Sequence, residues 1–240
     1  MQSENHRTWE ELSAQVDDTC HKFGAIILRT ASFSANPIST TLINTSSISR
    51  FNGLVSIVSE NIKNGLLYEI GLVPAEKEEA MKLNCWILLG SLTESALQMF
   101  LSIYADDYQD SKWQQWSELN EATVKKSIFE CINKLTSTGE ISTKQGYSLK
   151  DAIKDTLKKH TNEHLIQRVM LDELVQFYSS TKLLDDSDIA HLKVIQRNRN
   201  GIHSFQAREL GDWDDLKNEV EFFCHLLNWI IDSIPDVSDL

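Results

Sequence analysis

The sequence predicts an all-α protein, a bundle of about eight helices. Gly and Pro are scarce, at nine and three of 240 residues, whereas helix-forming Leu, Ala, Lys and Glu are plentiful. Apolar residues recur every three or four positions through most of the chain, which is the spacing of one helix face. Alternating apolar and polar runs joined by hairpin turns, the pattern of β-strands, are not found in the sequence.

The first part of the chain contains two predicted helices. Apolar side chains keep helical spacing over residues 8–31. Residues 32–47 are rich in Ser, Thr and Asn and are expected to form a loop. A second helix is predicted over residues 49–70, where Gly71 ends it.

We expect two parts that pack together as one globular unit. Residues 1–74 are predicted to be an N-terminal helical extension, and residues 75–240 a helical core domain. A chain of this length can bury a substantial core. No linker long enough to separate the two parts lies between them.

A predicted helix over residues 75–107 is the most apolar in the chain. Its apolar residues form two stripes, so we expect it to be buried on more than one side, at the centre of the bundle. Residues small enough to let neighbouring backbones approach lie in its middle: Gly90, Ser91, Ser95 and Ala96.

Glu94 interrupts one apolar stripe of this helix, between Ile87 and Leu97. An isolated buried carboxylate is costly, so Glu94 is expected to find a partner. Three possibilities are open: it reaches water near a helix end, it pairs with an unrelated Lys, or it orients Arg197 or His203.

The remaining helices follow from the same periodicity and from capping residues. They are predicted over residues 113–138, from a capping box of Ser148 and Asp151 to residue 159, over residues 163–183, and over residues 213–234. One more helix begins among Asp185, Asp186 and Asp188, whose negative charges suit a helix N-terminus.

The chain is acidic, with 23 Lys and Arg against 35 Asp and Glu and a formal net charge of −12. Such a chain is repelled by phosphate backbones at long range, which excludes a nucleic-acid binder that works by wide counterion release. Any chemistry on nucleic acid must therefore be local. Basic residues gather in two places, an expected solvated helix face with Lys150, Lys154, Lys158, Lys159 and His160, and the pair Arg197 and Arg199.

We expect a cytoplasmic protein that needs no cofactor and does not enter a membrane. The sequence has no run of about 18 uncharged apolar residues, and residues 1–7 lack the basic start and apolar stretch of a signal peptide. The cysteines are widely separated within helical patterns, so buried thiols are expected rather than disulfides or zinc ligands: Cys20, Cys85, Cys131 and Cys224.

The most informative segment is residues 197–203, which read Arg-Asn-Arg-Asn-Gly-Ile-His. It places a permanent cation, an amide and a titratable imidazole close together. These groups are the ones that cleavage of RNA without a metal requires. A His moves the proton of a ribose 2′-hydroxyl, and an Arg holds the phosphate as negative charge builds on it.

This segment resembles the signature of the HEPN (higher eukaryotes and prokaryotes nucleotide-binding) superfamily. The signature is an Arg and a His separated by four to six residues on a late helix, often with Asn directly after the Arg. Here Arg197 and Asn198 are followed by His203, with a spacer of five residues. The resemblance covers seven residues directly, while the HEPN-like helical surroundings from residue 75 onward fit in general character.

The resemblance implies a metal-independent endoribonuclease, a toxin or phage-defence effector that acts as a homodimer on an RNA substrate. The ribose 2′-oxygen attacks the adjacent phosphate and leaves a 2′,3′-cyclic phosphate and a 5′-hydroxyl. His203 would be the general acid or base, Arg197 would bind the scissile phosphate, and Asn198 would position His203 or the phosphate. Arg199 and Glu94 are supporting candidates, for electrostatic support and for orienting Arg197.

An uninterrupted α-helix would not bring Arg197 and His203 to one side. Six residues turn the helix by about 600°, which leaves the two positions about 120° apart. Either the helix loosens or ends near Gly201, or a second copy of the chain supplies half of the site.

The chain departs from one subgroup of the superfamily. Members paired with a nucleotidyltransferase antitoxin continue the signature as His-x-Tyr and receive a nucleotide on that Tyr. This chain has His203-Ser204-Phe205, which lacks the hydroxyl. Control by that modification is therefore not expected, whereas masking by an antitoxin or another defence-system protein remains open.

Two other functions are open at this point. A non-catalytic HEPN-like module that binds a protein or nucleotide partner fits the acidic composition. A metal-dependent hydrolase is suggested by His160, Glu163 and His164, which match the H-x-x-E-H pattern of inverted zinc proteases. The phosphate-binding loop, the dinucleotide fingerprint and the nucleophile elbow do not occur in the sequence.

Overall fold

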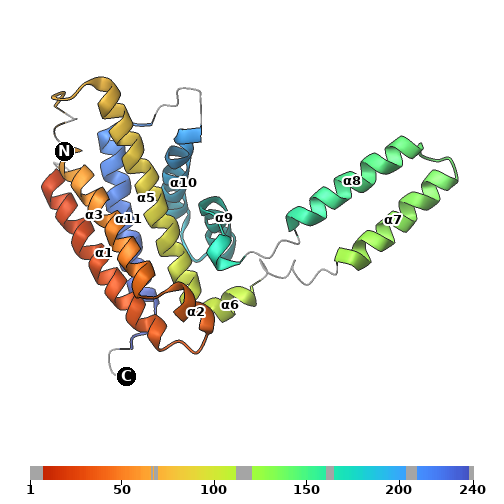
Figure 1. Cartoon of the computed structure of the whole chain (residues 1–240), viewed down its shortest axis with the longest axis horizontal. Coiled ribbons are helices and arrows are strands. Elements are labelled where there is room, and N and C mark those ends of the chain that lie inside the picture. The colour runs from red at the N-terminus through yellow and green to blue at the C-terminus, as the bar shows by residue number, and fades with distance from the viewer. Residues whose placement is uncertain are drawn as a thin grey trace. The chain divides into compact units, whose positions relative to one another are not determined.

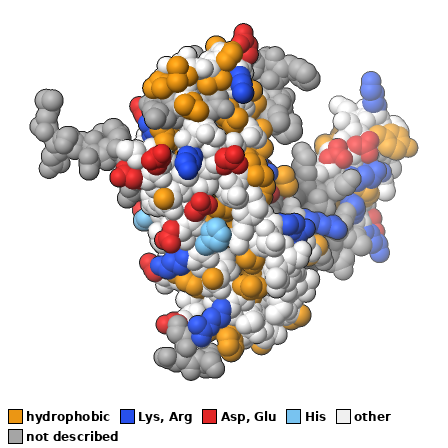
Figure 2. All heavy atoms as spheres, turned by 60° about the vertical axis from the view of Figure 1, so that its left-hand side comes forward, with side chains coloured by type: hydrophobic (Ala, Val, Ile, Leu, Met, Phe, Trp, Pro, Cys, Tyr) orange, Lys and Arg blue, Asp and Glu red, His pale blue; other side chains and the backbone are white. Residues whose placement is uncertain are grey.

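The computed structural model describes residues 8–65, 67, 70–111, 121–160, 165–203 and 210–237, without the side chains of residues 121–123, 158–160, 202 and 203. Every regular element in these ranges is helical, which confirms the all-α prediction (Figure 1). They contain ten α-helices, eight of which have seven residues or more. Acidic side chains are spread over the face drawn in Figure 2, in line with the negative net charge.

The chain divides into two compact units. The first is formed by Met1–Ala105 together with Val169–Leu240, and the second by Asp106–Arg168. This division differs from the predicted one after residue 74. Helices from both sides of residue 74 pack into the first unit. The segment that forms the second unit, Asp106–Arg168, had been expected within the core domain.

Four long helices form the bundle of the first unit: α1 (Trp9–Ser32), α3 (Thr45–Lys63), α5 (Ala75–Ile103) and α11 (Trp213–Ser233). Both α1 and α5 pack against α3 and α11, so the four close into a ring. Two further helices, α9 (Leu171–Thr181) and α10 (Asp186–Arg199), pack against α5, and α10 also contacts α11. The predicted central position of α5 agrees with these contacts.

Among the described residues, α5 is the one helix long and apolar enough to cross a membrane. Of its most apolar stretch of 18 residues, 61% is buried inside the protein. Its fully buried side chains include Trp86, Leu89, Leu92 and Leu97. The apolar surface of α5 is thus used in packing against the other helices of the bundle.

The predicted loop over residues 32–47 contains α2 (Pro37–Leu42) and the start of α3. Asn36 caps α2 by accepting a hydrogen bond from a backbone N–H. Asn44 does the same for α3, accepting from two N–H groups. Asn and Ser side chains cap helices as readily as they form turns, which explains why the composition was misread. At its other end α3 stops at Lys63, earlier than predicted.

The second unit is built mainly from α7 (Glu121–Ser137) and α8 (Thr143–His160), which pack against each other. The capping box predicted at Ser148 is wrong, because α8 begins earlier. Ser142 accepts from the backbone N–H of Gln145, and the Gln145 side chain accepts from the backbone N–H of Ser142. These two residues form the same reciprocal pattern, which begins at Ser142 instead of Ser148.

Other helices are shorter than predicted. A break after Ile103 separates α5 from the short α6 (Ala105–Gln109). Before α9, Ile166–Arg168 forms a 3₁₀ turn instead of continuous helix.

All four cysteines are free thiols. Cys20, Cys85 and Cys224 are buried as predicted, whereas Cys131 on α7 is exposed, contrary to the prediction. Burial raises the pKa of the Cys85 thiol to about 12 and also raises the pKa of Cys20. These two thiols therefore stay protonated at neutral pH and serve as small apolar groups.

The contact between α10 and α5 is closest at Gly90. A methyl group added at Gly90 would lie 2.5 Å from Cδ and 2.9 Å from Cβ of Arg199. The stem of the Arg199 side chain therefore runs directly over the α5 backbone. Gly90 is the residue that permits this approach, as the sequence of small residues around it had suggested.

Replacing Gly90 by Ala should lower the free energy of unfolding by about 1–3 kcal/mol, because overpacking outweighs the roughly 1 kcal/mol that Ala gains in helix propensity. Gly53→Ala is the matched control. Gly53 is exposed in the middle of α3, and no atom lies within 4 Å of an added methyl. That variant should gain up to about 1 kcal/mol. Urea denaturation measures both, and a stabilised Gly90→Ala variant would contradict the close contact.

Candidate functional site

Helix α10 presents the two arginines of residues 197–203 to opposite sides. As predicted, it starts beside Asp185, whose carboxylate accepts a hydrogen bond from the backbone N–H of Asp188. Two residues along an α-helix correspond to a rotation of about 200°. Arg199 accordingly reaches α5, and Arg197 lines a pocket toward α11.

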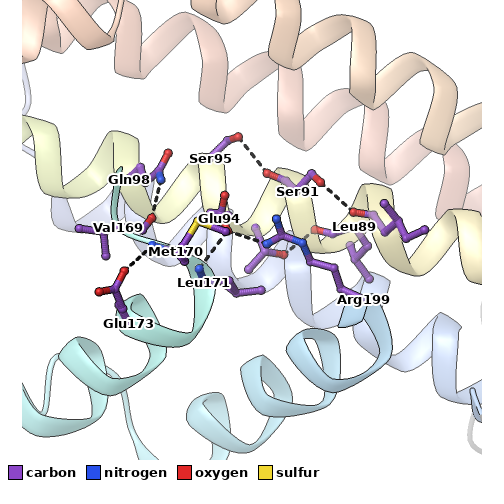
Figure 3. A network of polar contacts seen from close by, with 12 residues as sticks. Leu89, Ser91, Glu94, Ser95, Gln98, Val169, Met170, Leu171, Glu173 and Arg199 are labelled. Carbon is purple, nitrogen blue, oxygen red and sulfur yellow. Dashed lines mark hydrogen bonds and ion pairs between the residues drawn. The ribbon is translucent and has the colours of Figure 1, made fainter. Parts of the chain in front are cut away.

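Glu94 of α5 is bonded to Arg199. Its Oε2 accepts a hydrogen bond from Nη1 of Arg199 at 2.6 Å and another from the backbone N–H of Leu171 at 2.9 Å (Figure 3). Leu171 is the first residue of α9, so one carboxylate joins α5, α9 and α10. The expectation that Glu94 orients Arg197 is wrong, and the charge of Arg199 is used in a structural ion pair.

A pocket of about 900 Å³ lies between α10 and α11, and Gln15 of α1 also lines it. Arg197 and Asn198, both predicted site residues, belong to its lining. The described lining also contains two imidazoles, His191 and His225, and five carboxylates: Asp185, Asp188, Asp215, Glu219 and Glu221. The pocket is therefore polar and carries more negative than positive charge.

At the rim of this pocket, Arg197 is solvent-exposed. Its Nε donates a long hydrogen bond, 3.4 Å, to Oδ1 of Asn198. Within the described residues, no ion pair engages its guanidinium. The terminal nitrogens of Arg197 are thus available to an anion from solution, in contrast to those of Arg199.

His191 and Glu219, which both line the pocket, form a bonded pair. The Nδ1–H of His191 donates to both carboxylate oxygens of Glu219, at 3.0 and 3.1 Å. The imidazole stacks on Phe222 with ring centroids 4.6 Å apart and planes 13° apart. Glu219 is only 6% exposed, so a buried carboxylate fixes the orientation of a partly exposed imidazole.

The pKa of Glu219 is raised. Burial is the main cause, because it penalises the charged form, and the negative charge of Asp215 adds to it. The hydrogen bond and charge of His191 and the charge of Arg197 act in the opposite direction. The effect of Arg197 on Glu219 places the guanidinium within electrostatic reach of the bonded pair.

Asn198 is nearly inaccessible, with 2% of its surface exposed. Its Oδ1 accepts a hydrogen bond from Arg197, so the remaining polar atom of the side-chain amide is the donor Nδ2. In the part of the chain that the structure describes, Nδ2 has no hydrogen-bond partner. A buried donor without a partner is costly, so an acceptor that reached Nδ2 would bind there favourably.

The α-helix ends at Arg199, and Asn200–His203 continues as a 3₁₀ turn. A 3₁₀ turn rotates by about 120° per residue instead of 100°, so the angle between positions 197 and 203 falls from about 120° to about 60°. The loosening of the helix expected near Gly201 is therefore present in the backbone. The His203 side chain lies outside the described residues.

The alternative metal motif cannot be placed. Residues 161–164 and the side chain of His160 lie outside the described residues. Elsewhere in the described ranges, no group of three His, Cys, Asp or Glu side chains is arranged to hold a metal ion.

Sequence reasoning missed His191, His225 and Glu219. Glu219 carries the signal that singled out Glu94: it lies on the apolar face of its helix, three residues after Leu216 and four before Phe223. His191 precedes Asn198 by seven residues, which places the two on one side of α10. Helical spacing therefore indicates both the burial of Glu219 and the shared side of His191 and Asn198.

The chain has no match among protein-family models, curated proteins or solved structures. Its described side chains offer three chemical capacities around one pocket. Arg197 can bind an anion, Asn198 can donate to a buried acceptor, and the oriented imidazole of His191 can stack or exchange a proton. The carboxylates add acceptors for ligand N–H groups.

The two arginines should differ in their effect on stability. Arg199→Ala removes the ion pair with Glu94 and the stem over Gly90, and should lower the free energy of unfolding by about 2–3 kcal/mol. Arg197→Ala changes an exposed side chain and should shift it by less than about 0.5 kcal/mol. Urea denaturation measures the free energy of unfolding of both variants. Equal decreases would refute the assignment of a structural role to Arg199 and of none to Arg197.

The raised pKa of Glu219 predicts a pH-dependent gain for Glu219→Gln. The stability contributed by the protonated carboxyl is fully present below about pH 4.3, the ordinary Glu pKa, and is lost as pH rises through the raised folded value. The amide cannot ionise, so the variant should melt above the natural chain at pH 7, and the gap should close toward pH 4. Thermal melting from pH 4 to 8 checks this, with the exposed Glu60→Gln as control. A gap independent of pH would contradict the prediction.

Proposed function

We propose that this protein is a metal-independent endoribonuclease of the HEPN type. Arg197 binds the scissile phosphate at the rim of the α10–α11 pocket, and His203 moves the proton as the ribose 2′-oxygen attacks phosphorus. The bond from phosphorus to the 5′-oxygen breaks, and this oxygen takes up a proton in place of the one that the 2′-hydroxyl loses, which leaves a 2′,3′-cyclic phosphate and a 5′-hydroxyl. Asn198 positions Arg197 by accepting a hydrogen bond from its Nε.

The observation that carries this proposal is the different state of the two arginines. Arg199 is engaged by Glu94, whereas Arg197 is exposed and its terminal nitrogens are unpaired among the described residues. An available guanidinium beside a pocket is suited to bidentate binding of a phosphate. The change to a 3₁₀ turn after Arg199 adds support, because it turns position 203 toward the side of position 197.

The biological setting is part of the same proposal. The enzyme acts in the cytoplasm as a toxin or phage-defence effector, and it works as a homodimer. Its activity is held in check by an antitoxin or another defence-system protein that covers the Arg197 rim. The hydroxyl-free segment His203-Ser204-Phe205 favours masking over covalent modification.

The competing function is a non-catalytic module that binds a protein or nucleotide. The excess of carboxylates in the pocket favours the protein-binding form of this module, since carboxylates repel the phosphates of RNA and of nucleotides alike. The two functions separate cleanly in a cleavage assay, because a binding module produces no cyclic phosphate ends.

Purified protein should cleave RNA in the presence of EDTA and leave 2′,3′-cyclic phosphate ends. Arg197→Ala and His203→Ala should each reduce the rate by about 10²-fold or more, the usual effect of losing a phosphate-binding or proton-transfer group. Lys193→Ala removes an exposed cation one helical turn before Arg197 and should stay within about twofold. Loss of cleavage in EDTA, or no cleavage at all, would refute the proposal.

Mixing the two inactive variants tests whether one site draws on two copies of the chain. If Arg197 of one copy works with His203 of the other, half of randomly mixed dimers regain one of two sites, so about a quarter of the activity should return. If both residues act within one chain, mixing restores nothing. Size-exclusion chromatography confirms that subunits have exchanged.

A further inference from the structure

The proposed function uses only the rim of the α10–α11 pocket. Its interior combines features that phosphate binding does not explain: a buried amide donor without a partner, an excess of carboxylates, and an imidazole held flat on a phenyl ring. Each of these features restricts the chemistry of the ligand that would fill the pocket.

The buried amide requires an acceptor. Nδ2 of Asn198 has no partner among the described residues, and Asn198 is 98% removed from solvent by the fold, given its 2% exposure. A ligand atom that accepts a hydrogen bond at this point would satisfy the donor. A Lys or Arg side chain from a protein partner offers donors only and would leave Nδ2 unsatisfied.

The carboxylates require donors. Glu219 accepts from His191 but keeps further lone pairs on both oxygens, and Asp188 lies close enough to His191 to interact with it electrostatically. A phosphate placed between these groups would be repelled. The ligand portion inside the pocket must therefore carry N–H groups and no negative charge.

The ring of His191 supplies a flat surface. One side stacks on Phe222, and the side chain is 39% exposed, so part of the ring remains open to the pocket. Bases of single-stranded nucleic acid stack on such rings, and each stack contributes to affinity without a charge. Asn198 lies on the same side of α10, about 10 Å farther along the helix axis.

Guanine meets all three requirements. Its N1–H and N2–H are adjacent donors that match a carboxylate bidentately, and O6 beside them is an acceptor suited to an amide N–H. Uracil has only one ring donor. Adenine and cytosine present a single exocyclic amino group as donor, so neither offers a carboxylate two adjacent N–H groups from ring and amino positions.

We propose that the α10–α11 pocket binds a guanine base of the RNA, stacked on His191, with Glu219 accepting from its N–H edge and Asn198 donating to its O6. This inference rests on the proposed function in that the phosphate beside the bound guanosine lies at Arg197. Cleavage next to guanosine follows from it. Base binding is nonetheless measurable without any cleavage.

The test is calorimetric titration of the full-length protein with nucleosides, which lack phosphate. Guanosine should bind at least tenfold more tightly than adenosine, cytidine or uridine. Inosine, which differs from guanosine only by the missing 2-amino group, should bind at least tenfold more weakly than guanosine. Equal binding of guanosine and inosine, or binding of no nucleoside, overturns the proposal.

Variants identify the groups on the protein. Glu219→Gln should abolish the preference for guanosine over inosine, because the amide presents one acceptor where the carboxylate presents two. Asn198→Ala should weaken guanosine binding at least tenfold, and Lys193→Ala should leave it unchanged. Because Asn198→Ala empties a buried position and its failure to fold would remove that measurement, Glu219→Gln and the inosine comparison decide the matter alone.

The two proposals fail in different ways. RNA cleavage without guanosine binding would overturn the base-binding proposal and leave the nuclease intact. Guanosine binding without RNA cleavage would refute the nuclease and keep the pocket as a guanine site. Sequencing of the cleavage products is a third test. Cuts at sites unrelated to guanosine would contradict the placement of the guanine base beside Arg197.

Discussion

The Glu94–Arg199 ion pair over Gly90 fixes the direction in which every side chain of α10 points. The stem of Arg199 can cross α5 only where no Cβ intervenes, and the carboxylate that receives its guanidinium also receives the first N–H of α9. These contacts set the rotation of α10 about its axis. Given that rotation, Arg197 faces α11 and Asn198 is buried at the pocket.

The general architecture was predictable because helical periodicity, scarce Gly and Pro, and capping residues all agree. Boundaries were less accessible. Polar residues near positions 36 and 44 cap helices where a loop was predicted. Two residue pairs, Ser142 with Gln145 and Ser148 with Asp151, both have the sequence of a capping box, and the first pair forms it. Local sequence offers both choices, and packing of the following apolar residues selects between them.

The candidate site was predicted in part. The sequence identified Arg197 and Asn198, which line the pocket, and it identified Glu94 as a carboxylate in need of a partner. It did not reveal which arginine Glu94 would bind, because that depends on the packing angle of α10 against α5. The position of Glu219 on the apolar face of its helix indicated a buried carboxylate, but its partner His191 could not be identified from the sequence, because that pairing depends on how α10 packs against α11.

The path of the chain between α5 and α9 has a consequence for how this protein could be altered. The residues that follow Asp106–Arg168 are bonded to α5: Nε2 of Gln98 donates to the carbonyl of Val169 at 2.7 Å, and Glu94 receives the N–H of Leu171. The chain therefore re-enters the bundle beside α5, the same helix from which it leaves. The helical hairpin behaves as an insertion, a segment that evolution or an engineer can lengthen, exchange or remove while the bundle keeps its connectivity.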